Sequence, residues 1–144
     1  MRKLVLLLAS ALELPPSVRG VIADCGFSSP EAIMRSILRA HVKWLPAGPL
    51  LGLMDVCTRV FAGFSIKEAS TLDAVSKTKR PILFIHGTAD DFIPYEMMDT
   101  LYNAKPGDNK AELTAEGAGH GEAMYALGDS YWDTVFDFIA PYMA

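Results

Sequence analysis

Two side chains that can share a proton stand just beyond hydrophobic segments of this sequence. Asp90 lies in the segment PILFIHGTADDFIP (81–94), and His120 lies in the glycine-rich segment GAGHGEAM (117–124). A carboxylate can accept a hydrogen bond from an imidazole and thereby fix which ring nitrogen carries the proton. An imidazole between glycines has no helix face to pack on and is free to act as a general base. Asp90 and His120 are therefore predicted to be the acid and the histidine of a nucleophile–histidine–acid site.

The other acids and histidines fit these two roles less well. Asp91 is the adjacent alternative to Asp90, but its place at the start of the following segment predicts a helix cap. Asp24 ends a hydrophobic segment and could also reach an imidazole, although a hydrogen bond to the local backbone is the simpler expectation. His86 is expected to be a strand-end side chain bonded to backbone rather than a second base. His41 falls on a predicted helix surface.

No metal or cofactor is expected. The histidines at 41, 86 and 120 are scattered along the chain, and the two cysteines, Cys25 and Cys57, match no metal-ligand spacing and build no disulfide framework. Both cysteines are predicted to be reduced, structural thiols. A nucleophile–histidine–acid site needs no metal ion for its chemistry.

The composition is that of one folded domain spanning residues 1–144. Hydrophobic residues make up 51% and charged residues 21% of the 144 residues, with no low-complexity tract, which argues against disorder. The formal net charge is -4 and no Lys/Arg cluster occurs, which argues against nucleic acid as a partner. The chain is expected to act on small molecules, if it acts as an enzyme at all.

Three short segments predict buried strands. They are VRGVIA (18–23), ILFIH (82–86) and AELTA (111–115), each bounded by turn residues. The first two are nearly continuous apolar runs, which is typical of parallel strands covered on both faces. Helical patterns lie between and after them, at Pro30–Lys43, Leu50–Phe61, Thr71–Ser76, Tyr95–Ala104 and Tyr131–Tyr142. The sequence therefore predicts an α/β fold of about three parallel strands with flanking helices.

The segment 26–80 is much longer than one crossover between parallel strands requires. It carries Trp44, Met54, Phe61 and Phe64 within a few helical turns. One interpretation is a helical insertion that packs a small core of its own. The other, compatible with the first, is a lid over a substrate pocket.

Four segments resemble a known superfamily. DCGFSSPEA (24–32), FAGFSIKEAS (61–70), PILFIHGTADDFIP and GAGHGE look like the C-terminal half of the α/β-hydrolase superfamily, closest to small bacterial hydrolases of the serine aminopeptidase or esterase-like group. The resemblance extends over nearly the whole chain. It implies that the acid follows the penultimate strand and the histidine follows the last one, which places them at Asp90 and His120. It implies an ester, amide or peptide substrate.

The nucleophile of such a site is missing from the sequence. The superfamily nucleophile sits on a G-x-S-x-G elbow between a strand and a helix, and no such motif occurs among the 144 residues. If the resemblance holds in register, Met1 replaces the residue directly after the nucleophilic serine. Cys25 follows a strand and could act as a thiolate beside His120, but on a different strand from the superfamily nucleophile. The isolated chain is therefore expected to be inactive.

The resemblance to the superfamily also predicts an uncovered sheet edge. The strand 18–23 should pair with the strand that carries the nucleophile, and without it an apolar edge is exposed. We expect a homo-oligomer or a partner chain to cover that edge. A different class of function, a non-enzymatic oligomerisation or interaction module that reuses the half-fold, is the alternative to an inactive hydrolase.

The N-terminal segment has two interpretations. Met1-Arg2-Lys3 followed by LVLLLASAL resembles a short signal peptide with a small-residue cleavage site, and a buried helix over Leu4–Leu12 is the alternative. The apolar run is too short to span a bilayer. The superfamily resemblance favours the helix, because it corresponds to the helix behind the nucleophile, and so favours a cytoplasmic protein without a membrane partner.

Overall fold

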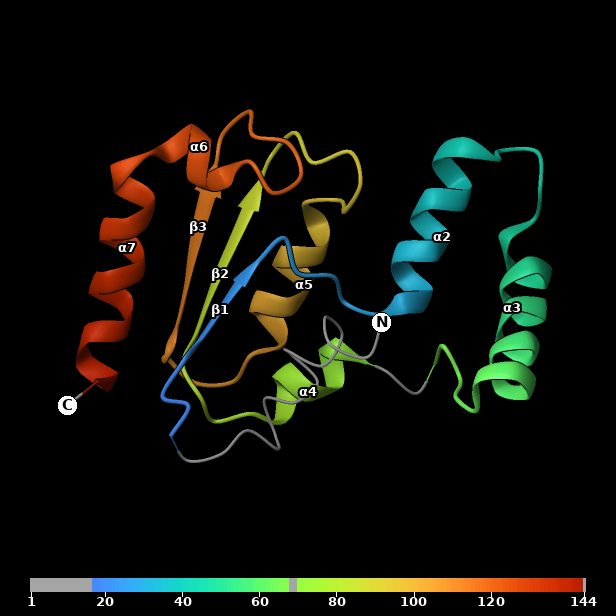
Figure 1. Cartoon of the computed structure of the whole chain (residues 1–144), viewed down its shortest axis with the longest axis horizontal. Coiled ribbons are helices and arrows are strands. Elements are labelled where there is room, and N and C mark those ends of the chain that lie inside the picture. The colour runs from blue at the N-terminus through green and yellow to red at the C-terminus, as the bar shows by residue number, and fades with distance from the viewer. Residues whose placement is uncertain (1–16, 68–69, 144) are drawn as a thin grey trace.

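A computed structural model describes residues 17–67 and 70–143, which form a small parallel sheet between two layers of helices (Figure 1). The strands are β1 (Val21–Asp24), β2 (Ile82–Gly87) and β3 (Lys110–Ala115), and their order in the sheet is the order in the chain. Both neighbouring pairs are parallel. The predicted α/β class with three parallel strands is confirmed, although β1 begins three residues later than the apolar run at 18–23.

The helices follow the predicted segments closely. They are α2 (Pro30–His41), α3 (Ala47–Ala62), α4 (Thr71–Lys77), α5 (Glu96–Ala104), α6 (Ala123–Leu127) and α7 (Asp129–Ile139), followed by the 3-10 turn η2 (Ala140–Tyr142). The short helix α6 was not predicted, and α7 begins two residues earlier than expected. The helix expected over Leu4–Leu12 lies outside the described residues.

The central strand β2 is buried on both faces, which explains its continuous apolar sequence. Alternate side chains point to opposite faces of a strand. One face of the sheet packs against α4 and α5, and its buried cluster comprises Val21, Ala23, Val75, Ile82, Phe84, Met98 and Leu101. The other face packs against α6 and α7, and its buried cluster comprises Leu83, Ile85, Ala115, Ala118, Ala123, Tyr131 and Val135.

The long connection between β1 and β2 places α2 and α3 to one side of the sheet (Figure 1). The start of α2 at Pro30 agrees with the predicted helix, and it is capped because the Ser29 hydroxyl accepts a hydrogen bond from the Ala32 amide and proline occupies the first turn. One of the two interpretations of this insertion, a small core of its own, is not supported by three of its rings. Trp44 is 82% exposed, Phe61 87% and Phe64 45%, so these rings do not pack a core among the described residues.

A buried carboxylate anchors the end of α3 to the chain that returns toward the sheet. Asp55 accepts hydrogen bonds from the Ser65 hydroxyl, the Ile66 amide and the Arg59 guanidinium. The burial of Asp55 raises its pKa, but the Ser65 hydroxyl, Arg59 and Ile66 together more than offset that effect and the pKa is lowered. The segment that follows α3, at Ser65 and Ile66, is therefore held to the helix by hydrogen bonds to the Asp55 carboxylate.

None of the helices in the described part of the chain is both long and apolar enough to cross a bilayer.

Candidate active site

The predicted acid lies in a tight turn directly after β2. The Asp90 carboxylate accepts hydrogen bonds through Oδ1 from the backbone amides of Phe92 (3.0 Å) and Ile93 (2.8 Å), so its side chain closes the turn that leads toward α5. The Asp90 side chain is fully buried. The local sequence DDFIP produces this turn because an aspartate can bond the amides two and three residues ahead of it.

The predicted histidine lies in the loop that follows β3. The Ala118 carbonyl accepts a hydrogen bond from the Ala89 amide (3.0 Å), and the Gly117 amide donates to the Thr88 hydroxyl (2.8 Å). These hydrogen bonds hold the loop that carries His120 (the histidine loop) beside the loop that carries Asp90 (the acid loop). Gly117 and Gly121 adopt positive φ angles of 72° and 71°, which a glycine tolerates and most other residues do not.

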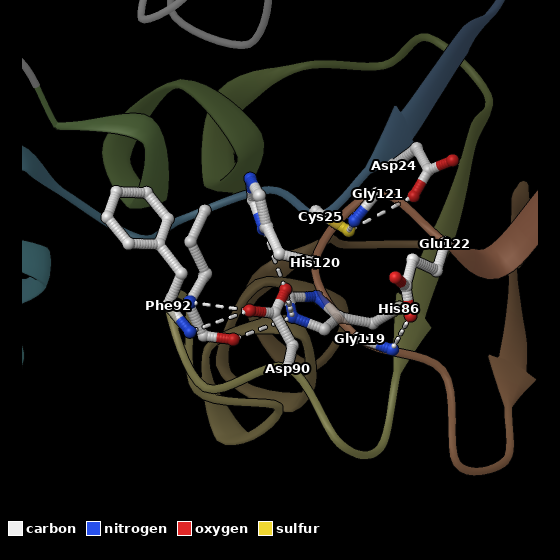
Figure 2. A network of polar contacts seen from close by, with 10 residues as sticks. Asp24, Cys25, His86, Asp90, Phe92, Gly119, His120, Gly121 and Glu122 are labelled. Carbon is white, nitrogen blue, oxygen red and sulfur yellow. Dashed lines mark hydrogen bonds and ion pairs between the residues drawn. The ribbon is translucent and has the colours of Figure 1, made fainter.

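The two loops bring the predicted pair together. Nδ1 of His120 lies 2.9 Å from Oδ2 of Asp90, as Figure 2 shows. Because a carboxylate oxygen accepts, Nδ1 carries the proton and donates it, and Nε2 of a neutral ring is left as an acceptor. The His120 side chain is 42% exposed, and the ring of Phe92 contacts it edge-on at 5.1 Å between centroids. This arrangement leaves a basic nitrogen on a ring that solvent reaches.

The carboxyl group of Asp90 stays charged over a wide pH range. Burial alone would raise its pKa, but the Ile93 amide, the His120 ring and the Phe92 amide all bond the charged form and lower the pKa below its usual value. A charged Asp90 can orient the neutral His120 ring and stabilise it when it becomes protonated.

The other acid and histidine considered from the sequence, Asp24 and His86, make different contacts from those of the pair. Among residues 17–67 and 70–143, no hydrogen bond joins Asp24 to an imidazole or to the local backbone, which differs from the simpler expectation. It accepts hydrogen bonds from the Tyr131 hydroxyl (2.9 Å) and the Cys25 thiol (3.3 Å). His86 does bond backbone as expected, with Nε2 2.9 Å from the Ile93 carbonyl oxygen, and it also lies 3.2 Å from Oδ2 of Asp90. Sequence reasoning missed this second contact.

Cys25 lies beside the pair but is poorly suited to be its nucleophile. Its thiol donates to Asp24, and its sulfur accepts a hydrogen bond from the Gly121 amide at 3.3 Å. Burial raises the pKa of this thiol to about 12, and the nearby carboxylates of Asp24 and Asp90 add to the effect. Cys25 also has a positive φ of 53° at the end of β1, a conformation that non-glycine residues rarely adopt.

Three side chains come close enough to share a metal ion. One ligand atom each from Cys25, Asp90 and His120 lies within 4.8 Å of the other two. The donor set resembles that of some zinc sites, in which a cysteine binds the metal as the thiolate and each ligand atom offers a free lone pair. Here the thiol donates to Asp24, and Oδ2 of Asp90 already contacts His120 and His86. The residues therefore fit a hydrogen-bonded network better than a metal site.

A hollow of about 510 Å³ lies between α2 and α5. Its lining residues are Ser28, Ser29, Glu31, Ala32, Arg35, Ser36, Arg39, Pro94, Glu96, Met97 and Thr100. Neither Asp90 nor His120 lines it, although Pro94 belongs to the same connection between β2 and α5. We place the site at the acid–histidine pair because reactive side chains meet there, whereas the hollow shows only paired and exposed charges such as Glu31 with Arg35.

Comparison with known proteins matches the fold described above. No family model matches the chain. Over 118 residues it is 35% identical to YqkD of Bacillus subtilis, an uncharacterised protein, covering 82% of this chain and 38% of that protein. Over 133 residues it is 26% identical to the α/β-hydrolase domain-containing protein WAV2 of Arabidopsis thaliana, covering 89% of this chain and 41% of that protein.

Solved structures show the same fold. An esterase of Pyrococcus furiosus superimposes with a TM-score of 0.66 at 17% sequence identity, covering 97% of this chain and 50% of the esterase chain. The chain spans about two fifths of the length of the curated relatives and half of that esterase. Three parallel strands with helices on both faces, matched across almost the whole chain, identify it as a partial α/β-hydrolase fold.

Proposed function

We propose that this chain carries the acid and the histidine of a hydrolase site that cleaves ester, amide or peptide bonds. The observation that carries the proposal is the 2.9 Å contact between Nδ1 of His120 and the buried, charged carboxylate of Asp90. The exposed part of the His120 ring leaves room for a nucleophile and a substrate. The esterase among the structural neighbours favours esters as the first substrates to test.

In this role His120 removes the proton from a nucleophilic hydroxyl as that hydroxyl attacks the carbonyl carbon. It then gives the proton to the leaving group, and Asp90 stabilises the protonated ring between the two steps. No described hydroxyl or thiol hydrogen bonds to the His120 ring, and no G-x-S-x-G motif occurs in the sequence. The hydroxyl therefore has to come from another segment or another chain.

It follows that the 144 residues alone lack efficient hydrolase activity. Loss of one oxyanion donor typically costs about 10²–10³ in rate, and loss of the nucleophile costs more. The purified chain is assayed with short p-nitrophenyl esters and a fluorophosphonate probe. Hydrolysis at background level without labelling is the expected result, and stoichiometric labelling of a serine would contradict it.

The proposed roles of Asp90 and His120 can be tested only in a protein that also contains the nucleophile. The DNA upstream of the Met1 codon is read in the same frame for a G-x-S-x-G motif, and the extended chain is expressed. We expect ester hydrolysis, and we expect His120→Gln and Asp90→Asn each to reduce kcat about 10³-fold or more. Full activity in either variant would refute the proposal, whereas His41→Gln on the surface of α2 is the matched control and should change nothing.

A second candidate function, self-association through the sheet edge, is favoured by the state of β1. This strand pairs only with β2 among the described residues. The amides of Val21 and Cys25 donate toward β2, so the alternate amides of Ile22 and Asp24 point to the side of β1 away from β2. A second copy of the chain could add a strand there.

Light scattering and hydrogen exchange test this candidate together. Association predicts a dimer mass and a slow exchange of the Ile22 and Asp24 amides that becomes slower as the protein concentration rises. A monomer in which these two amides exchange as fast as those of an open loop would exclude it.

A further inference from the structure

His86 is a second imidazole in direct contact with the acid of the predicted pair. It lies in β2, with no solvent exposure, and its Nε2 is 2.9 Å from the Ile93 carbonyl oxygen and 3.2 Å from Oδ2 of Asp90. Oδ2 of Asp90 thus lies between the rings of His86 and His120 (Figure 2).

The direction of the His86 hydrogen bond follows from its partners. Because a peptide carbonyl can only accept, Nε2 of His86 carries a proton and donates it to the Ile93 carbonyl, while Oδ2 of Asp90 lies 3.2 Å from the same nitrogen. Oδ1 of Asp90 is occupied by two backbone amides. The carboxylate therefore has donors on both oxygens and cannot rotate without losing one of them.

The other nitrogen of His86 indicates that packing alone does not explain this residue. Nδ1 of His86 is buried and has no hydrogen-bond partner in the described structure. A buried polar atom without a partner costs about 1–3 kcal/mol. The buried strand positions just before it, Phe84 and Ile85, are apolar and avoid this cost. A compensating role at Nε2 accounts for a histidine here.

We propose that His86 is a positioning residue for Asp90. The partial positive charge of its Nε2–H group, 3.2 Å from Oδ2, attracts that oxygen toward the side of Nδ1 of His120, and its hydrogen bond to the Ile93 carbonyl closes the turn that carries Asp90 against the end of β2. The ring itself is fixed by the strand and by an edge-on contact with Tyr95 at 5.9 Å between centroids. This inference rests on the acid–histidine role proposed above and adds a residue that reaches His120 only through Asp90.

Two variants of His86 separate positioning from packing. In His86→Gln the side-chain amide nitrogen can occupy the place of Nε2, donate to the Ile93 carbonyl and face Oδ2 of Asp90. In His86→Phe the ring volume is kept but the donor is lost. His41→Gln is the matched control, since His41 is an exposed histidine on α2. Dispersed amide spectra establish that each variant is folded.

The readout is the proton on the His120 ring, observed in long-range ¹H–¹⁵N spectra at neutral pH. In the unmodified chain, in His86→Gln and in His41→Gln we expect the Nδ1–H form with slow solvent exchange of that proton. In His86→Phe we expect a mixture of tautomers and exchange about 10-fold faster or more, which matches the loss of one hydrogen bond to a charged group. If His86→Phe does not fold, His86→Asn, whose amide cannot reach the Nε2 position, is expected to give the same result.

The outcomes distinguish this inference from the proposed function. If the unmodified chain lacks the Nδ1–H form of His120, the acid–histidine pair itself fails, and the role of His86 fails with it. If the unmodified chain has that form and a folded His86→Phe or His86→Asn keeps it with unchanged exchange, only the positioning role is overturned.

Discussion

The carboxylate of Asp90 is the most constrained side chain of the site. Its Oδ1 accepts hydrogen bonds from two backbone amides, and its Oδ2 hydrogen bonds to His120 and lies 3.2 Å from Nε2 of His86. A charge buried with this many donors is stabilised in its ionised form, as the lowered pKa of Asp90 indicates. The same donors serve the fold, because they close the turn after β2, and the chemistry, because they aim one oxygen at His120.

The lowered pKa of Asp90 predicts a loss of stability in acid. Its pKa in the folded state lies below the ordinary aspartate value of 3.8, so its contribution to stability is fully present above pH 3.8 and is lost as the pH falls through the lower pKa of the folded state. Asp90→Asn should therefore destabilise the chain at pH 7 by about 1–3 kcal/mol, and by less near pH 2. Urea unfolding at both pH values measures the difference. An equal effect at the two pH values would contradict the assignment.

The two cysteines should differ in reactivity. Cys25 is buried with a pKa of about 12, whereas Cys57 is exposed on α3. Iodoacetamide at pH 8 is expected to label Cys57 and to leave Cys25 unmodified, because only the thiolate reacts. Peptide mass spectrometry of the native and the urea-unfolded chain gives the ratio, with unfolded Cys25 as the internal control. Rapid labelling of native Cys25 would reopen its candidacy as a nucleophile.

At the scale of elements, the site depends on the close approach of two loops. The acid loop leaves β2 at Gly87, and the histidine loop crosses directly over that glycine. A Cβ added at Gly87 would lie 2.1 Å from the Ala118 carbonyl oxygen, far inside van der Waals contact. Only a residue without a side chain allows the backbone of one loop to lie on the backbone of the other.

Gly87→Ala should therefore force the loops apart. We expect a destabilisation of about 1–3 kcal/mol, the usual cost of overpacking, and a weakened His120–Asp90 hydrogen bond. Gly52→Ala is the matched control, because the added methyl group meets nothing within 4 Å in α3. It should stabilise the chain by about 0.5–1 kcal/mol. Thermal or urea unfolding decides the signs, and equal effects of the two substitutions would be inconsistent with this geometry.

A second element-level link joins α3 to the returning chain through Asp55. Removal of its carboxylate in Asp55→Ala leaves the Ile66 amide and the Ser65 hydroxyl without this acceptor. The Ile66 amide should then exchange with solvent faster, while the amides of β2 keep their protection. Hydrogen exchange followed by mass spectrometry or NMR measures both segments. Unchanged protection at Ile66 would indicate that other contacts hold the return.

Across the whole molecule, large apolar side chains are exposed on several elements. One group lies on α3 and the turn before it and comprises Trp44, Leu53, Val56, Val60 and Phe61; others lie on the acid loop and on α6 and α7. Large exposed apolar patches are common at the interaction surfaces of proteins. The position of the α3 group on the helical insertion, away from the sheet in Figure 1, separates it from the parts that hold the acid–histidine pair.

Charged substitutions on this patch should change association without changing the fold. Val60 and Phe61 are 70% and 87% exposed, so Val60→Lys with Phe61→Lys is expected to alter the free energy of unfolding by less than about 0.5 kcal/mol per site. The onset of aggregation or self-association should move to higher protein concentration. Urea unfolding and sedimentation measure the two effects. A large loss of stability would indicate that the patch is packed in the native chain.

The strands and the main helices could be predicted from local sequence patterns. A strand that is buried on both faces has a continuous apolar sequence, and a helix start is marked by a capping residue. The run ILFIH and the cap at Ser29 are examples. These patterns did not predict α6, which has only five residues and no capping side chain. The sequence also could not predict that Phe61 is exposed among the described residues. Helical periodicity shows which side chains share a face of a helix, but it does not show what that face packs against.

Within the site, the nearness of Asp90 and His120 followed from their places after neighbouring strands. The contacts of Asp24 with Tyr131 and of His86 with Asp90 did not follow, because each depends on the path of a loop. Both residues of the His86–Asp90 contact belong to the H-G-x-x-D motif, so the sequence contained the pair. The contact could not be predicted from the motif alone, because it depends on the turn that brings Asp90 back over the end of β2.

The acid, its two imidazoles and the glycine between them all fall within residues 86–120, on two strands adjacent in both sequence and space. The insertion at 26–80 enters the chain before this unit begins. Changes in the length or sequence of the insertion should therefore leave the geometry of the Asp90–His120 pair unaltered. Under the proposed function, substrate selectivity and the acid–histidine contact would be separately mutable traits.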